Sequence, residues 1–167
     1  MDQAFRDAIT AGYALEEPSI ILGSALHGDL PLNTTRVQVS LAMLNRHGLI
    51  AGATGTGKTK TLQLMAGQLS AAGIPVFVSD IKGDVTGIAA PGDAADARIQ
   101  DRAASLEWTF TPAGHPVEFL SLSGSLGGQV RATVSSFGPL LLGKVLDLNE
   151  TQTSILALVF KYCDDND

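Results

Sequence analysis

The run at residues 52–59 constrains this chain more than any other part of its sequence. It reads Gly-Ala-Thr-Gly-Thr-Gly-Lys-Thr, so glycines recur and a lysine–threonine pair closes the run. Glycines allow backbone conformations in which successive N–H groups point into one concavity, where an anion can sit. Lys58 adds a mobile positive charge, and the hydroxyl of Thr59 is a ligand that Mg²⁺ accepts. Every fixed position of the pattern G-x-x-x-x-G-K-[ST] is filled, which predicts a loop that binds nucleotide phosphates.

The segments on either side of this loop support that interpretation. The run 48–51 is short and apolar, as a buried strand would be, and residues 58–72 carry Leu62, Met65 and Leu69 at helical spacing. A loop between a strand and a helix presents its ligand to the positive end of the helix dipole. We therefore expect the nucleotide to be bound by Gly52, Ala53, Thr54, Gly55, Thr56, Gly57, Lys58, Thr59 and Lys60.

A second apolar run, 75–79, completes a strand–loop–helix–strand unit of the ~30 residues that a parallel crossover needs. Asp80 follows this run directly, and Lys82 and Asp84 come soon after. Because ligands of open parallel sheets bind beyond the carboxyl ends of the strands, these side chains are expected near the nucleotide. We predict that Asp80 and Thr59 are the metal ligands. Lys82 and Asp84 fit a solvated turn equally well.

Composition narrows the class of protein. The 167 residues are 45% apolar and only 17% charged, which is typical of a globular domain. The net charge of -6 argues against a strongly basic surface for nucleic acid. Cys163 is the single cysteine, so no disulfide can form within one chain. With no signal-peptide pattern and no apolar run near the ~20 residues of a membrane helix, we expect a cytoplasmic protein without membrane contact.

The rest of the chain is expected to divide into two parts. Residues 1–44 form a short helix at 2–12 and a small β element with strands at 19–23 and 37–41, joined by a turn-rich piece. Residues 45–167 form a nucleotide-binding core. Its further expected elements are a helix at 93–106, a hairpin of 108–110 with 117–122, a helix at 139–146, and a last helix opened by a capping box of Asn149 and Gln152.

Three stretches together resemble the HerA-like helicase/ATPase family, in the HerA–FtsK group of P-loop NTPases. They are 45–59, which contains the loop; 76–87, with Asp-Ile-Lys-Gly-Asp; and 131–152, with Ser-Phe-Gly-Pro and Leu-Asn-Glu-Thr-Gln. The resemblance covers roughly 20–163, the amino-terminal part of a family member. It implies an α/β fold with a RecA-like parallel sheet flanked by helices, ATP and Mg²⁺ as ligands, and a homohexameric ring that moves DNA through the full-length protein.

One departure from the family limits what this chain is expected to do. In the family an acidic pair, Asp-Glu, follows a later apolar strand, and no Asp-Glu pair occurs in this sequence. The arginine finger of relatives also lies further along. We therefore expect a truncated P-loop core that binds ATP, uses Lys58 and Asp80 in catalysis, and is catalytically incomplete by itself.

Two other functions stay open from the sequence. The chain could be a self-sufficient small NTPase or kinase that uses Asp80 as its metal-side acid. It could also be a non-catalytic module whose assembly is gated by nucleotide. Robust turnover that is lost on Asp80→Ala favours the first, whereas binding without hydrolysis favours the second. The guanine-binding run Asn-Lys-x-Asp is absent, which favours adenine as the base.

Overall fold

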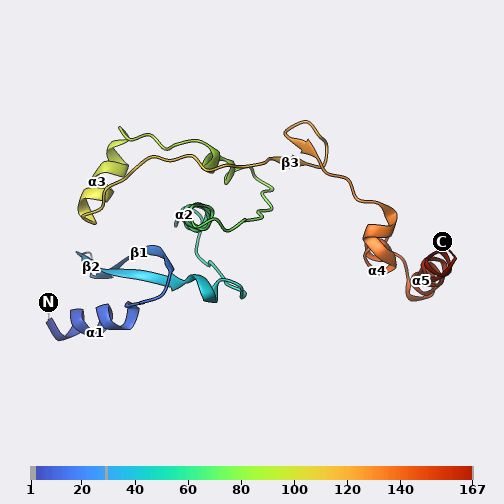
Figure 1. Ribbon diagram of the computed structural model, residues 1–167, viewed down its shortest axis with the longest axis horizontal. Coiled ribbons are helices and arrows are strands. Elements are labelled where there is room, and N and C mark those ends of the chain that lie inside the picture. Colours follow the sequence, from blue (N-terminus) through green and yellow to red (C-terminus); the bar gives the residue numbers. More distant parts are fainter. Residues whose placement is uncertain (1–2, 29, 167) are drawn as a thin grey trace. The chain divides into compact units, whose positions relative to one another are not determined.

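A computed structural model of the chain describes residues 3–28 and 30–166. It is a mixed α/β structure (Figure 1). The elements are α1 (Gln3–Tyr13), β1 (Ser19–His27), β2 (Leu30–Ser40), the 3-10 helix η1 (Leu41–Met43), α2 (Lys58–Ala71), the 3-10 helix η2 (Thr86–Ala89), α3 (Ala97–Ser105), β3 (Leu120–Ser121), β4 (Gly128–Gln129), α4 (Val134–Val145) and α5 (Glu150–Asp165).

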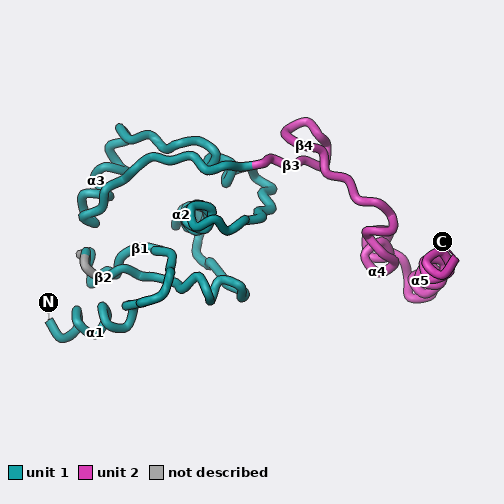
Figure 2. Tube along the Cα trace, viewed as in Figure 1, with its two compact units in different colours: residues 1–117 teal, residues 118–167 magenta. Residues whose placement is uncertain are grey.

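The chain separates into two compact units, 1–117 and 118–167 (Figure 2). The loop at 52–59, α2 and the Asp-Ile-Lys-Gly-Asp run all belong to the first unit. The boundary expected after residue 44 from the sequence stays a prediction. No helix in the described residues combines the length and the apolar character needed to cross a bilayer.

The small β element expected near the amino terminus is confirmed, and it is larger than predicted. β1 and β2 pair antiparallel in a register that places Ile20 opposite Val39, with irregularities in β1 near Ile21–Gly23 and Ser24–Leu26. Pairing continues through most of the piece expected to be turn-rich. Side chains of both strands are buried, because Leu32 and Thr35 are each only 1% exposed and Ile20 only 2%.

α1 covers one part of this hairpin (Figure 1). The hydroxyl oxygens of Thr10 and Thr35 lie 2.6 Å apart, so a polar contact joins α1 to β2. The helix expected at 2–12 is thus present, although residue 2 lies outside the described residues.

α2 is confirmed over nearly its whole predicted length and is tied to β1 by one side chain. Gln68 donates from Nε2 to the carbonyl of Ile21 and accepts from the Ile21 N–H, both at 2.8 Å. Behind this contact, a Cβ added to Gly67 would lie 2.8 Å from Nε2 of His115, so the helix also packs closely against the 112–116 turn. These contacts hold the carboxyl-terminal half of α2 in the first unit.

The described residues do not form the full RecA-like parallel sheet that was predicted. The runs 48–51 and 74–80 are not part of any ladder, and the described residues hold only the antiparallel β1–β2 pair and the short parallel β3–β4 pair. Parallel sheets are almost always covered on both faces. Leu49 is 88% exposed and Phe77 86% exposed, so in this structure neither run has that cover.

The hairpin expected from 108–110 and 117–122 is also wrong. The turn between them packs on η2 instead, where the N–H of His115 donates to the carbonyl of Ile88 at 3.1 Å. Leu120–Ser121 then pairs parallel with Gly128–Gln129. The intervening glycine-rich loop is long enough to return the chain beside itself in the same direction.

The amino-terminal end of α5 has its predicted capping residues. Asn149 accepts from the N–H of Gln152 at 2.9 Å, and Gln152 Oε1 accepts from the Asn149 N–H at 3.0 Å, so the capping box of α5 is confirmed. α4 begins earlier than expected, after Thr133, and is kinked at Gly138 just before Pro139. The kink marks the position where the sequence predicted the helix to start.

Candidate phosphate-binding site

The loop at 52–59 has the backbone that its glycines permit. Gly57 adopts a φ of 95°, in the left-handed region, and passes directly into α2 as its N-terminal cap. A Cβ added to Gly52 would lie 2.5 Å from the hydroxyl oxygen of Thr56, so the two ends of the loop approach each other closely. A side chain at Gly52 would displace that of Thr56, and one at Gly57 would strain the backbone.

Lys58 lies across this loop. Its Nζ donates to the carbonyl of Ala53 at 2.6 Å, and the Thr56 hydroxyl donates to the same oxygen at 2.8 Å. An ammonium group has three donors, so the other two are available to an anion. Neither salt bridge of the described residues involves Lys58. The positive charge is therefore held at the loop without a carboxylate to neutralise it.

The first turn of α2 adds backbone donors to this charge. The cap residue Gly57 has no side chain to bond the first N–H groups, and the earliest helical bond runs from the Thr61 N–H to the Gly57 carbonyl at 2.9 Å. N–H groups ahead of that bond have no acceptor within the helix. Together with the helix dipole they favour a bound anion.

Asp80 does not face the loop through any hydrogen bond of the described residues. Its two carboxylate oxygens accept from the N–H groups of Gly83, at 2.8 Å, and Val85, at 2.9 Å. The bond from Val85 lowers the pKa of Asp80 below its ordinary value, the bond from Gly83 adds to this, and partial desolvation opposes both. Asp80 therefore holds the 80–84 turn in shape as a carboxylate.

Asp84 is the acid that the structure brings to Thr59. The Thr59 hydroxyl donates to Oδ2 of Asp84 at 3.0 Å, and Nε2 of Gln63 donates to the Asp84 carbonyl at 3.0 Å. From the sequence, Asp84 fits a solvated turn as well as a functional role, and Gln63 is not singled out. The spacing of Thr59 and Gln63, four residues apart on one helix face, was the signal that could have found this pair.

Lys60, the last residue of the predicted nucleotide-binding set, is directed along the helix. Its Nζ donates to Oε1 of Gln63 at 3.0 Å. Its direct contact with nucleotide stays a prediction, as do the contacts expected from the rest of the loop.

The oxygen groups beside the loop fit a magnesium ion that arrives with a nucleotide. The described residues hold no group of three or more His, Cys, Asp or Glu side chains that could bind a metal alone. Mg²⁺ at nucleotide sites needs no such group, because phosphate oxygens and water fill most of its ligand positions. Thr59 and Asp84 supply a hydroxyl and a carboxylate within 3.0 Å of each other. Both are the hard oxygen donors that this ion prefers.

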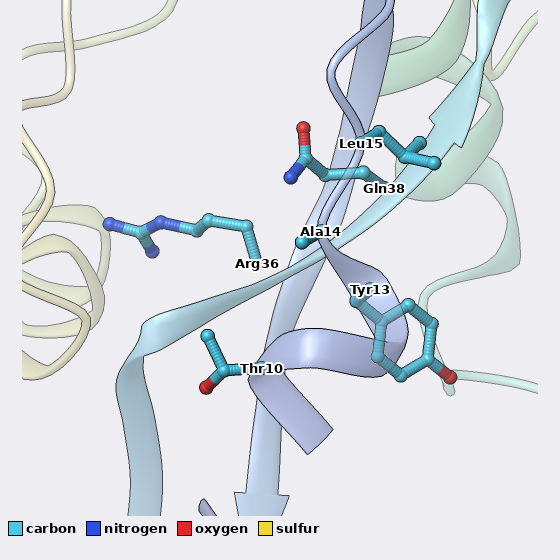
Figure 3. A pocket seen from close by; sticks show the side chains of 6 residues that line it. All are labelled: Thr10, Tyr13, Ala14, Leu15, Arg36 and Gln38. Carbon is cyan, nitrogen blue, oxygen red and sulfur yellow. The ribbon is translucent and has the colours of Figure 1, made fainter. Parts of the chain in front are cut away.

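A pocket of about 230 Å³ lies elsewhere in the first unit, between α1 and β2 (Figure 3). Its lining residues are Thr10, Tyr13, Ala14, Leu15, Arg36 and Gln38. Arg36, its one charged side chain, donates to the hydroxyl of Ser24 at 2.8 Å and lies 5.0 Å from the ring centroid of Trp108. The guanidinium thus already has partners within the fold. The loop at 52–59 is therefore a better candidate site than this pocket.

Comparison with known proteins agrees with the sequence resemblance. No curated protein and no solved structure matches the chain. A family model described as "Helicase HerA-like C-terminal" matches residues 29–167, a span that includes the loop, α2 and the 80–84 turn. This is nearly the same part of the sequence that carries the resemblance. The chain belongs to the HerA-like helicase C-terminal family.

Proposed function

We propose that this chain is the ATP-binding segment of a DNA-translocating, helicase-like ATPase. The observation that carries the proposal is the loop itself: Lys58 lies across it at 2.6 Å from the Ala53 carbonyl, and α2 begins directly behind it. Membership in the HerA-like helicase family supports an ATPase role for a site of this kind. The absence of the guanine-binding run favours ATP over GTP.

The loop would bind the triphosphate with its own backbone. The N–H groups of the loop and of the first turn of α2 face the phosphates, and Lys58 exchanges the neutral Ala53 carbonyl for a phosphate oxygen. That exchange is favourable because the ammonium then meets a negatively charged acceptor in place of a neutral carbonyl, which adds Coulombic attraction. Thr59 would hold Mg²⁺, which supplies neutralisation of the charge on the outer phosphates.

Hydrolysis needs groups that the loop does not provide. A carboxylate must orient the attacking water, and a cation must offset the developing charge. Asp80 could serve as such an acid only by leaving the N–H groups of Gly83 and Val85. An arginine finger is worth ~10³ to 10⁵ in rate. We therefore propose that the chain alone binds ATP and hydrolyses it slowly.

The partners of the proposed motor follow from its family. We propose that the full-length protein forms a homohexameric ring in the cytoplasm and moves DNA. The net charge of -6 gives this chain little attraction for phosphates of DNA, so any DNA binding by the chain alone should be weak and lost as salt rises.

The Lys58→Ala variant tests the proposal. It removes a charge that contacts only a loop carbonyl, so folding should be retained while affinity for a non-hydrolysable ATP analogue with Mg²⁺ falls by roughly 10- to 100-fold, the value of one hydrogen bond to a charged group. Isothermal titration calorimetry measures the change. Lys161→Ala is the control, because Lys161 is an exposed lysine of α5, outside the loop, and its Nζ bonds only Asp165.

Three results would redirect the proposal. Equal affinities of wild type and Lys58→Ala would contradict the placement of the phosphates. Fast turnover by this chain alone, lost on Asp80→Ala, would indicate a self-sufficient NTPase or kinase. Tight binding that never leads to hydrolysis, even in the full-length protein, would indicate a nucleotide-gated assembly module.

A further inference from the structure

The 80–84 turn gives its two acids different roles. Both carboxylate oxygens of Asp80 accept hydrogen bonds from N–H groups of the turn, whereas Oδ2 of Asp84 accepts one from the Thr59 hydroxyl at 3.0 Å. We propose that Asp84 is a positioning residue that orients the Thr59 hydroxyl for Mg²⁺ and so makes the site select the magnesium complex of the nucleotide. This inference rests on the proposed function of the loop.

The direction of the Thr59 hydrogen bond is the core of the argument. A hydroxyl has one proton to donate and two lone pairs, and a cation binds only through the lone pairs. With its proton donated to Asp84, Thr59 keeps its lone pairs available. Thr61, two residues along the same helix, shows the alternative, because its hydroxyl donates to the backbone carbonyl of Gly57 at 3.2 Å. Asp84 offers Thr59 a charged acceptor in place of such a carbonyl.

Asp84 is also fixed to α2 at a second point. Gln63 donates to the Asp84 backbone carbonyl at 3.0 Å, and Lys60 donates to Gln63 at 3.0 Å. Thr59 and Gln63 stand four residues apart on one face of α2, so side chain and backbone of Asp84 are held by adjacent helical turns. A carboxylate held in this way loses little further freedom when an ion binds beside it, and its negative charge attracts that ion.

This arrangement predicts a specific pattern of nucleotide affinities. Removing the acceptor and its charge should weaken binding of the magnesium complex and leave binding of metal-free nucleotide unchanged or stronger, since a negative charge near the phosphates is lost. Partners that orient metal ligands typically contribute 10- to 100-fold in metal affinity. A residue that merely supported the fold would change both affinities together.

The experiment titrates the 167-residue chain with a fluorescent, non-hydrolysable ATP analogue, once with excess Mg²⁺ and once with EDTA. For Asp84→Ala we expect the ratio of the two affinities to fall roughly 10- to 100-fold from its wild-type value. Asp84→Asn keeps an acceptor for Thr59 without the charge and should recover part of that ratio. Gln63→Ala loosens the backbone contact while keeping the carboxylate, and should lower the ratio by a smaller factor. It carries the test if Asp84→Ala does not fold.

Two controls separate this inference from its competitors. Asp101→Ala removes an exposed acid of α3 and should leave the ratio unchanged. Asp80→Asn tests the acid that the sequence favoured. If Asp80→Asn removes the Mg²⁺ preference while Asp84→Ala keeps it, Asp80 is the metal-side acid and our assignment is overturned. Equal loss of both affinities in Asp84→Ala would also overturn it.

The wild-type titration tells the two proposals apart. Binding of the analogue with a clear Mg²⁺ preference, together with an unaltered preference in both Asp84 variants, would remove the role of Asp84 and leave the proposed function standing. A wild-type chain that binds the analogue in neither condition would remove the proposed function, and this inference with it.

Discussion

β1 and the segment 74–80 both contain runs of aliphatic residues, but their environments differ. Ile20 in β1 is 2% exposed, whereas Phe77 is 86% exposed. β1 meets its antiparallel partner β2 after a short turn and has α2 on its other side through Gln68. The segment 74–80 pairs with no other segment of the described residues. Apolar sequence alone therefore does not make a strand; a partner within reach does.

The largest test of this comparison removes one apolar side chain from each region. Ile20→Ala leaves a cavity where a fully buried side chain of β1 was, and should lower the free energy of unfolding by about 2 to 5 kcal/mol. Phe77→Ala removes a larger but exposed side chain and should change it by less than about 0.5 kcal/mol. Urea denaturation of both variants measures the difference. Similar losses would show that the 74–80 segment is packed as firmly as β1.

A smaller effect is expected where α2 joins β1. Gln68→Ala removes both bonds to Ile21 and leaves part-buried backbone groups without their side-chain partner. We expect a loss of about 1 to 3 kcal/mol in the free energy of unfolding. Gln100→Ala, which removes one exposed bond to the Ala94 carbonyl, is the control and should have little effect. Hydrogen exchange at the Ile21 amide would detect the loss directly, and unchanged protection there would contradict the contact.

The next largest loss of stability is expected from a change in backbone conformation at the start of α2. Gly57→Ala places a Cβ on a residue with φ of 95°, which should cost about 1 to 2 kcal/mol of folding free energy. Gly48→Ala is the matched change in the preceding apolar segment, where a Cβ would meet no atom within 4 Å. Thermal unfolding of the two variants compares them. A loss for Gly48→Ala as large as that for Gly57→Ala would mean that the 48–51 run is packed more tightly than the structure shows.

The smallest expected effect compares a charged helix cap with a neutral one. Asp96 caps α3, and its hydrogen bonds from Arg98 lower its pKa from 3.8 to about 2. Because the folded pKa is depressed, the stabilisation is complete above pH 3.8 and is lost as the pH falls through about 2. Amide signals of α3 should therefore shift with pH in this window and become insensitive to it in Asp96→Asn. The N-cap of α5 is the neutral pair Asn149 and Gln152, so protonation cannot remove that cap.

Short-range features of the structure could be predicted from the sequence. α2 follows from apolar spacing and a glycine-rich entry, and α5 follows from a capping box in which both partners lie within four residues. α3 begins later than the predicted helix, because Asp96 is its N-cap. In each case the deciding contacts lie within one helical turn, where sequence spacing states them directly.

Long-range features could not be predicted in the same way. The predicted parallel sheet needed the runs 48–51 and 74–80 to pair with other strands. The apolar pattern of a segment does not indicate which other segment, if any, it will pair with. The choice between Asp80 and Asp84 depended on how a five-residue turn folds back on α2. In the structure, backbone N–H groups of the turn bind the Asp80 carboxylate. Because every residue except proline has a backbone N–H group, the sequence does not indicate this contact.

The contact between Gln68 and Ile21 has a consequence for the solubility of the hairpin. A primary amide has an N–H donor and a C=O acceptor, as a peptide group does. The Gln68 side chain therefore makes the two hydrogen bonds that one residue of a neighbouring strand would make. An open strand margin is where foreign chains add and aggregation begins. By occupying the free N–H and C=O of Ile21, a helix side chain shields β1 from such additions at the place where its backbone would otherwise be exposed.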